Sequence, residues 1–287
     1  MTGMVRGTVL GVDRESGTVR ADIDGVVVPA APFMGDPPWP LSVCWFFNGP
    51  AYTCLGPVGG RRWCFQDDFN YYRSATPYVS TGWTDGGDAG GSLSNPADPS
   101  DGCGVLRLTT VTTGDLYFLR KTLQLVTLES DRVYWLSARV RQSADLGGMD
   151  VGFAVSNWLN LGAAAASDAA SVVSLSSAEN VVLTAKGTSE NVVATGESSA
   201  ADTWVWVDVM VAGGQWAAGW VDGSGPWVSD VEVPGTSEES VTPYIGVGSD
   251  GAGNTVDVDY CALAVVDQDT TVDPTTFGNS EDPTDTT

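Results

Sequence analysis

The chain has 287 residues, a length that suits one large domain or two ordinary ones. Its apolar fraction of 43% can fill hydrophobic cores, which excludes wholesale disorder. The net charge of −23, from 36 acids against 13 bases, argues against a nucleic-acid partner because an acidic surface repels phosphate. Solubility alone, divalent-cation sites or an electropositive partner would each account for this charge.

Histidine is absent, which removes the commonest general base and the commonest transition-metal ligand. The five cysteines form no Cys-x-x-Cys pair, so a zinc site is not expected. Cys44 and Cys54 flank a predicted hairpin and can sit side by side, either as a disulfide or as buried reduced thiols. The start of the chain lacks the apolar stretch of a secretion signal, and no run of 18 apolar residues follows. We therefore expect synthesis in the cytoplasm without membrane insertion.

The first part of the chain alternates strands and turns without a helical pattern. Apolar side chains at Val19, Ala21 and Ile23 alternate with polar ones, and the hairpin turn Asp24-Gly25 follows. Strands are predicted at residues 5–12, 18–23, 26–30, 41–47 and 51–55. Five short strands suit a small closed barrel, since closure removes the exposed edges of so small a sheet.

Short glycine-containing phrases in this part resemble the OB-like barrels that open many tail proteins of long-tailed phages of actinobacteria. The phrases are Gly7-Thr8-Val9, Gly17-Thr18-Val19, Asp24-Gly25, Gly35-Asp36 before a strand, and Leu55-Gly56 at the last one. The run Pro37-Pro38-Trp39-Pro40 departs from that family by lengthening the loop after Gly-Asp. The resemblance implies an OB-like docking barrel over residues 1–60 and a minor tail protein of a virion.

A second, longer β-pattern follows the predicted linker Gly59-Gly60-Arg61-Arg62. Residues 84–104 read as a polar loop, and residues 163–170 as a loop or a single helical turn. About twelve strands without crossover helices must pair antiparallel and form two packed sheets. They are predicted at residues 105–109, 116–123, 134–141, 149–156, 172–175, 181–185, 192–195, 204–211, 216–221, 228–233, 241–247 and 256–265.

This second module resembles the concanavalin- and laminin-G-type jelly rolls, over residues 61–267. The resemblance rests on Asp67-Asp68-Phe69-Asn70, Gly152-Phe153, Trp216 with Trp220-Val221-Asp222-Gly223, and Val258-Asp259-Tyr260. It implies that the first and last strands of the module lie side by side and that Asp-Gly is a tight turn. Residues 268–287 form an acidic Thr/Pro-rich tail, either free or lying as an arm on a neighbour.

One face of the predicted strand 204–211 carries the candidate binding residues, while the other face is entirely valine and is the natural inner face. Tryptophans beside a carboxylate can stack a sugar ring; alternatively, these side chains fill a second, minor core under loops. Trp158 is predicted on a loop, where it suits protein contacts. The candidate carbohydrate- or partner-binding residues are Trp204, Trp206, Asp208, Trp216, Trp220 and Trp158.

Four aspartates come together if the terminal strands pair as the resemblance implies, namely Asp67, Asp68, Asp257 and Asp259. Crowded carboxylates need a counter-charge, so they either bind a structural calcium ion or are solvated turn residues. No other cofactor is expected.

We expect no catalytic residues. The Glu-x-Asp-x-x-Glu string that jelly-roll glycoside hydrolases carry on one strand is absent, and histidine and lysine fall short of what lyases of this fold use. The preferred hypothesis is a structural virion protein, a phage minor tail or tail-tip component that contacts other virion proteins or a host-surface glycan during host attachment. A homo-oligomer within a symmetric ring or fibre is expected from virion symmetry. The alternatives are a capsid decoration or head-fibre protein and a glycan-active enzyme.

Overall fold

The computed structural model describes residues 3–69, 82–87, 91–98, 103–110, 116–121, 126–129, 131–143, 149–155, 172–177, 181–186, 190–194, 201–230, 240–248 and 254–277. In these ranges the regular structure is β-strand, apart from short 3-10 helices. No helix within them has the length and apolarity needed to span a membrane. The all-β fold that the sequence predicts is confirmed. The predicted loop or helical turn at 163–170 lies outside the described residues.

The first five strands form one antiparallel sheet in the order β3-β2-β1-β4-β5. A parallel bridge between Phe33 and Cys54 joins its two edge strands, so the sheet closes into a barrel. Cys44 and Cys54 are buried in its core as free thiols, as in the reduced alternative. The strands are β1 (Gly3–Asp13), β2 (Thr18–Ile23), β3 (Val26–Pro32), β4 (Val43–Asn48) and β5 (Tyr52–Pro57).

The predicted alternation of β2 is confirmed, because Val19, Ala21 and Ile23 are buried in the barrel core. The turn to β3 is as tight as its residues suggest. Asp24 and Gly25 have φ of 53° and 79°, the left-handed conformation that two-residue hairpin turns require.

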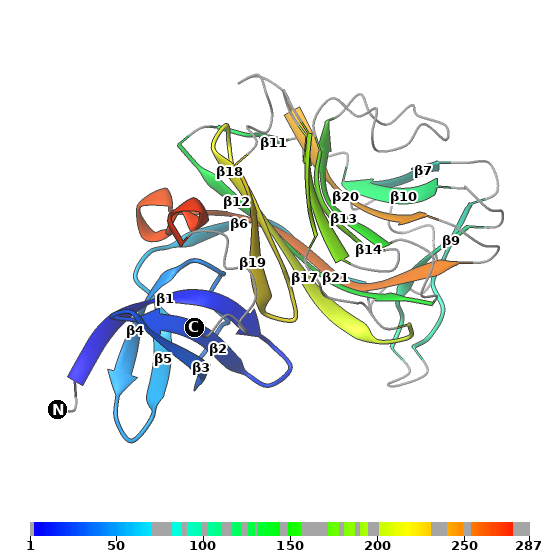
Figure 1. The fold of residues 1–287 in the computed structure, drawn as a ribbon. Coiled ribbons are helices and arrows are strands. Elements are labelled where there is room, and N and C mark those ends of the chain that lie inside the picture. The colour runs from blue at the N-terminus through cyan, green and yellow to red at the C-terminus, as the bar shows by residue number, and fades with distance from the viewer. Residues whose placement is uncertain are drawn as a thin grey trace.

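The rest of the chain forms two eight-stranded antiparallel sheets that pack face to face as a sandwich (Figure 1). We call the sheet next to the barrel the near sheet, ordered β19-β18-β17-β12-β21-β9-β8 with β6 also pairing with β21. Its strands are β6 (Arg61–Asp68), β8 (Ser92–Ser94), β9 (Leu106–Thr109), β12 (Val133–Gln142), β17 (Trp204–Ala212), β18 (Trp216–Val221), β19 (Ser224–Ser229) and β21 (Thr255–Val266).

The other sheet, the far sheet, is ordered β16-β15-β14-β13-β20-β10-β7, with β11 also pairing with β20. Its strands are β7 (Trp83–Gly87), β10 (Leu116–Lys121), β11 (Val126–Thr127), β13 (Met149–Val155), β14 (Val172–Ser177), β15 (Val181–Lys186), β16 (Glu190–Ala194) and β20 (Ser240–Gly248). Three strands correct the sequence analysis. β6 begins within the predicted linker, and β7 and β8 lie in the segment predicted as a loop.

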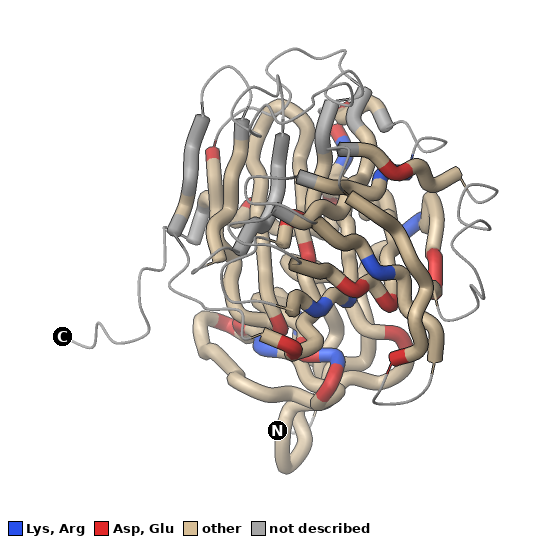
Figure 2. Tube along the Cα trace, turned by 90° about the vertical axis from the view of Figure 1, so that its right-hand side faces the viewer, with Lys and Arg blue, Asp and Glu red and all other residues tan. Residues whose placement is uncertain are grey.

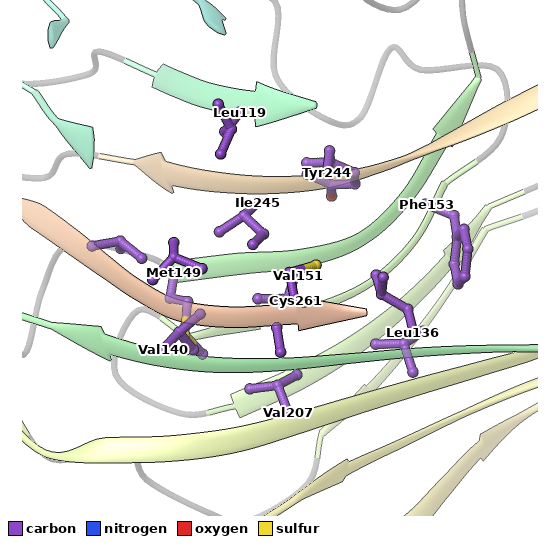
Figure 3. Packing of buried hydrophobic residues seen from close by; sticks show 14 of the residues in the cluster. Leu119, Leu136, Val140, Met149, Val151, Phe153, Val207, Tyr244, Ile245 and Cys261 are labelled. Carbon is purple, nitrogen blue, oxygen red and sulfur yellow. The ribbon is translucent and has the colours of Figure 1, made fainter. Parts of the chain in front are cut away.

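The main core lies between the two sheets, where inward-facing side chains of both meet (Figure 3). Leu136 and Val140 of β12 and Val207 of β17 come from the near sheet, and Val151 and Ile245 come from the far sheet. All five are fully buried. Burying an aliphatic side chain of this kind contributes about 1.5–3 kcal/mol, so this core is the main source of the sandwich's stability.

A second core lies on the outer face of the near sheet, where the barrel covers it. We call it the junction core: Trp39, Leu41, Val133, Trp135, Met210, Ala212, Trp216, Ala218, Trp220, Ala264 and Val266. Trp39 and Leu41 come from the barrel side and the others from the near sheet. The Pro-rich loop that departs from the barrel family therefore supplies a tryptophan that attaches the barrel to the sandwich.

The segment after β21 lies against this junction, where Figure 1 draws it in red. It contains the 3-10 helices η4 (Gln268–Thr270) and η5 (Pro274–Phe277). Thr271 forms a β-bridge with Ser42, and its Oγ1 accepts a hydrogen bond from Trp39 Nε1 at 3.2 Å. The amide of Val272 donates to the carbonyl of Leu41 at 3.0 Å. Residues 268–277 of the predicted tail thus tie the barrel to the sandwich, and residues 278–287 lie outside the described part.

Candidate binding site at the barrel–sandwich junction

Strand β17 has the two faces that its alternation predicts. Its valines point into the main core, and Val207 and Val209 are fully buried there. Trp204, Trp206 and Asp208 lie on the other face, the outer face of the near sheet. The candidate residues of this strand therefore share one face, although they differ in exposure.

Trp216 and Trp220 of β18 are buried, with exposed fractions of 3% and 0%. Both belong to the junction core, and Trp220 Nε1 donates to the carbonyl of Leu10 in β1 at 2.8 Å. Their expected role in surface contacts is wrong, because the barrel covers their rings and leaves no face for a sugar. The alternative of a second core describes these residues, with the barrel rather than loops as its cover.

Asp208 is also buried, at 1% exposed, and is held by a residue of the barrel. Arg14, in the turn between β1 and β2, donates two hydrogen bonds to its carboxylate, each at 2.8 Å. Trp135 Nε1 donates a third, also at 2.8 Å. The Arg14 guanidinium lies over the Trp206 ring at 4.6 Å from the centroid. Asp208 therefore binds the barrel, which corrects its assignment as a sugar-binding carboxylate.

An open cleft of about 410 Å³ remains where this turn meets the near sheet. The rings of Trp206 and Tyr260 stand 5.5 Å apart at its wall, tilted by 60°. Burial raises the pKa of the Tyr260 hydroxyl, while its hydrogen bond with Gln66 and the Arg14 charge act in the opposite direction. The lining residues are Arg14, Glu15, Asp68, Arg139, Trp206, Asp259 and Tyr260.

Charged side chains form the rim of this cleft. Arg139 donates to Asp259 at 2.8 Å and forms an ion pair with Glu15 of the barrel turn at 3.1 Å. Half-buried aromatic rings beside such donors and acceptors can stack on an apolar ring face and hydrogen-bond its hydroxyl groups. The cleft thus combines aromatic ring faces with charged hydrogen-bonding groups.

Trp204 lies one row further along the same face, away from the barrel. It is half-buried between Arg139 and Arg141, whose guanidinium groups lie 5.0 and 4.6 Å from its ring centroid. Its Nε1 donates to Asp98 at 3.0 Å. Two arginines and an aspartate thus hold Trp204 in place beside the cleft. Trp158, the remaining candidate, lies outside the described residues.

The terminal strands of the sandwich pair as the resemblance implied, with Asp67 of β6 opposite Cys261 of β21. Basic partners are found for Asp67, Asp257 and Asp259. Asp67 accepts hydrogen bonds from Lys121 and from Trp83 Nε1, the latter at 2.6 Å. Asp259 is paired with Arg139, as described above.

Asp257 is bound by Arg107 and Arg141, with shortest distances of 2.6 Å. Asp68 lines the cleft. Within the described ranges no group of three or more acidic or cysteine side chains is placed to hold a metal ion. Arginine and lysine thus supply a counter-charge to Asp67, Asp257 and Asp259, for which the sequence left calcium open as one alternative.

Four residues of the cleft were not identified from the sequence, namely Arg14, Glu15, Arg139 and Tyr260. Arg14 and Glu15 lie in the turn between the predicted strands 5–12 and 18–23, where no site was expected. One signal was available, because bases are scarce in this chain and a base in a turn of acids stands out. The partner of that base depends on how the two modules dock, which no local pattern specifies.

Comparisons with known proteins define the sandwich as a fold. No family model and no curated protein matches the sequence. A protein of unknown function from Shewanella oneidensis MR-1 superposes with a TM-score of 0.53 at 10% identity, over 75% of this chain and 91% of that one. Lectin II from Ulex europaeus does so with a TM-score of 0.50 at 12% identity, over 71% and 99%. A carbohydrate esterase of bacteriophage phi24B reaches 0.48 at 14% identity, over 72% and 99%.

The class of protein is therefore an all-β chain with a jelly-roll sandwich of the legume-lectin, concanavalin-like kind. Within that class, this chain is distinguished by the barrel docked on the outer face of its near sheet and by the cleft between the two. Sequence identities this low show that the fold is shared, and they do not identify a ligand for this chain.

Proposed function

We propose that the chain is a non-enzymatic structural protein of a phage virion, a minor tail or tail-tip component. In this proposal the barrel docks on another virion protein, while the sandwich projects and contacts a protein or a host-surface glycan. The virion assignment rests on the resemblance of the barrel phrases to those of phage tail proteins. The architecture agrees with it, since a closed five-stranded barrel precedes the sandwich.

The observation that carries the docking role is the distribution of exposed apolar side chains. Among the described residues, the large ones are confined to the barrel: Met4, Val26, Val27, Met34, Phe47, Leu55 and Val58, at 37–66% exposed. Met4 and Phe47 are cross-strand neighbours on β1 and β4. Apolar side chains gathered on one module of a soluble chain mark a contact surface.

Charge supports the same surface. Residues 1–58 carry three arginines and five acids, a net −2 of the total −23. Figure 2 shows that the hairpin next to the N-terminus is free of charged residues, whereas acids and bases gather in the rest of the molecule. An apolar, nearly neutral module at the end of an acidic chain suits a buried contact between proteins.

Particles produced by the genome that encodes this chain provide the test. Gold-labelled antibody against the chain should mark the tail tip. Label on the capsid shell alone would support a decoration or head-fibre protein instead, and unlabelled particles would reject a virion protein altogether. A Met4→Ser, Phe47→Ser double variant should fold and yet be lost from particles. Asp24→Asn is the matched control, because it changes an exposed barrel residue at a φ that asparagine tolerates.

Glycan contact is the second part of the proposal, and the Trp206–Tyr260 cleft supports it. On a saccharide array, with and without calcium, the chain should bind at least one class of sugar, and Trp206→Ala should abolish that binding. Trp45→Ala is the matched control, because Trp45 is a half-buried barrel tryptophan that also has an arginine over its ring. An array on which nothing binds would reject glycan contact and leave the docking role intact.

A glycan-active enzyme is the alternative that this proposal sets aside. The proposal of no catalysis is supported by the absence of histidine from the sequence and by the basic partners that engage Asp67, Asp257 and Asp259. Release of sugars from host cell-wall polysaccharide, abolished by changing one or two carboxylates, would overturn it.

A further inference from the structure

The open cleft at the barrel–sandwich junction holds more carboxylates than bases. Apart from its two aromatic rings, it is lined by three carboxylates and two guanidinium groups. These belong to Glu15, Asp68, Asp259, Arg14 and Arg139. Which charge a ligand meets in the cleft depends on how the two bases are already engaged.

Arg14 is engaged by a carboxylate that does not line the cleft. Two of its nitrogens donate to Asp208 at 2.8 Å each. The side chains of Arg14 and Asp208 are 9% and 1% exposed, so the pair is largely enclosed. Because one bidentate pair neutralises both groups, Arg14 supplies no spare positive charge to a ligand.

Arg139 is shared by two carboxylates of the rim. Its Nη1 donates to Asp259 at 2.8 Å, and its Nη2 lies 3.1 Å from the carboxylate of Glu15. The side chain of Glu15 is 63% exposed, so it stays accessible from the open side. One positive charge therefore serves two negative ones, and the rim has a place for a second cation.

The electrostatic field beside the cleft is negative as well. Asp222 accepts a hydrogen bond from the amide of Trp206 at 2.8 Å. Burial raises the pKa of Asp222, that hydrogen bond lowers it, and the charges of Asp13, Glu15 and Asp208 raise it further. Three like charges acting on one carboxyl group indicate that this end of the junction favours a cation.

The aromatic walls suit a cation too. The half-buried rings of Trp206 and Tyr260 stand 5.5 Å apart, and aromatic ring faces attract positive charge. Trp206 already has the Arg14 guanidinium over its ring, 4.6 Å from the centroid. A bare metal ion does not fit, because within the described ranges no three acidic side chains are placed to hold one. A larger organic cation can reach across the cleft of about 410 Å³.

We infer that this cleft takes a sugar with a free amino group, whose ammonium lies beside the carboxylates of Glu15 and Asp259 as the second cation of the rim. The apolar face of the sugar ring packs on the aromatic walls, and its hydroxyl groups hydrogen-bond to the charged rim. An acidic sugar is disfavoured, because both lining bases already have carboxylate partners. The inference rests on the proposed glycan contact and names the class of sugar.

Calorimetric titration tests this inference with oligosaccharides of glucosamine, glucose and glucuronate that share one length and linkage. At about pH 6 the carboxylates of the rim and the sugar amine are all charged at their ordinary pKa values. The glucosamine oligosaccharide should bind about tenfold or more tightly than the glucose one, a difference of about 1.4 kcal/mol. The glucuronate oligosaccharide should bind more weakly than either. Salt at about 1 M should remove most of the preference for the amine, because it shortens the screening length to about 3 Å.

Glu15→Gln separates the amine from the rest of the sugar. It removes one carboxylate of the rim at nearly constant shape, so it should abolish most of the preference for glucosamine and leave the binding of the glucose oligosaccharide unchanged. Asp24→Asn is the matched control, because it removes one exposed barrel carboxylate at the other end of β2 and should keep the preference. A urea midpoint close to that of wild type checks that each variant folds.

Other outcomes overturn the inference in distinguishable ways. Glucose or glucuronate oligosaccharides that bind as tightly as glucosamine would reject the amino sugar and leave glycan contact intact. A preference that persists in Glu15→Gln would show that this carboxylate does not hold the amine. Trilysine that binds as tightly as the glucosamine oligosaccharide would make a basic protein segment the occupant. If no oligosaccharide binds, the proposed glycan contact fails together with the inference.

Discussion

Replacing Arg14 by alanine is expected to destabilise the protein more than any surface change. The substitution leaves the Asp208 carboxylate in a site only 1% exposed, with Trp135 Nε1 as its one remaining donor among those described. Breaking a buried ion pair in this way costs about 3–5 kcal/mol, because the orphaned charge stays desolvated. The stacking of the guanidinium on Trp206 is lost as well, which adds about 0.5–2 kcal/mol. We expect a loss of about 3 kcal/mol or more in the free energy of unfolding.

Urea unfolding followed by tryptophan fluorescence measures this loss, since several tryptophans lie in the junction core. A double-mutant cycle with Asp208→Ala isolates the pair, and the double variant should lose much less than the sum of the single ones. Glu15→Gln is the control in the same turn. Its ion pair with Arg139 is 63% exposed on the glutamate side and should contribute at most about 1 kcal/mol. A loss below about 1 kcal/mol for Arg14→Ala, or no coupling to Asp208, would refute the conclusion that this buried ion pair holds the barrel on the sandwich.

Three further predictions concern the same junction. Gly11→Ala would place its Cβ 1.9 Å from the carbonyl oxygen of Gly223, so it should lower the melting temperature by several degrees. Gly60→Ala is the control and should leave the melting temperature unchanged, because the space around Gly60 is open. Equal melting temperatures for the two variants would contradict the close approach of Gly11 to Gly223. Partial desolvation and nearby carboxylates raise the pKa of Asp222, so its ionisation lowers the stability of the fold as pH rises through the folded-state pKa. Asp222→Asn should therefore melt higher than wild type at pH 7 and lose that advantage below the ordinary pKa of 3.8. A lower melting temperature of this variant at pH 7 would contradict the prediction. Ending the chain at Asp267 removes the segment bound to the barrel and should lower the urea midpoint, and an unchanged midpoint would mean that this segment does not hold the modules together.

The strands with regular alternation could be predicted from the sequence, because their burial follows from the pleat. β2 begins and ends where its pattern does, and β17 has the valine face inside. The turn Asp222-Gly223 is tight as predicted, with both residues at positive φ. In each case the residues of one short stretch of sequence are enough to determine the local structure.

The strands that were missed owe their existence to a partner. β7 and β8 lie at the edges of the two sheets and pair with β10 and β9. Their Gly, Asp and Ser residues have low strand propensity, so only the neighbouring strand stabilises them in extended form. β19 begins at Ser224, earlier than predicted, because it pairs with β18 directly after the Asp-Gly turn.

The candidate site on β17 could be predicted only in part, for a related reason. Alternation specifies the face on which Trp204, Trp206 and Asp208 lie, but it does not specify how far along the strand the barrel covers that face. The barrel turn seals Asp208 behind Arg14 but leaves Trp206, beneath the same guanidinium, half-buried at the wall of the cleft. Tryptophan side chains suit a core and a contact surface equally well, which is why composition alone left both readings open.

The position of Arg14 links the two roles assigned to the chain. The same guanidinium holds the barrel by its bond to Asp208 and forms a wall of the cleft by its stacking on Trp206. The barrel is therefore part of the cleft, and a ligand that contacts Arg14 favours the docked arrangement of the modules. If the cleft binds a glycan as proposed, the Arg14→Ala variant should therefore lose junction stability and glycan binding together, and a variant that loses only one of the two would contradict this link.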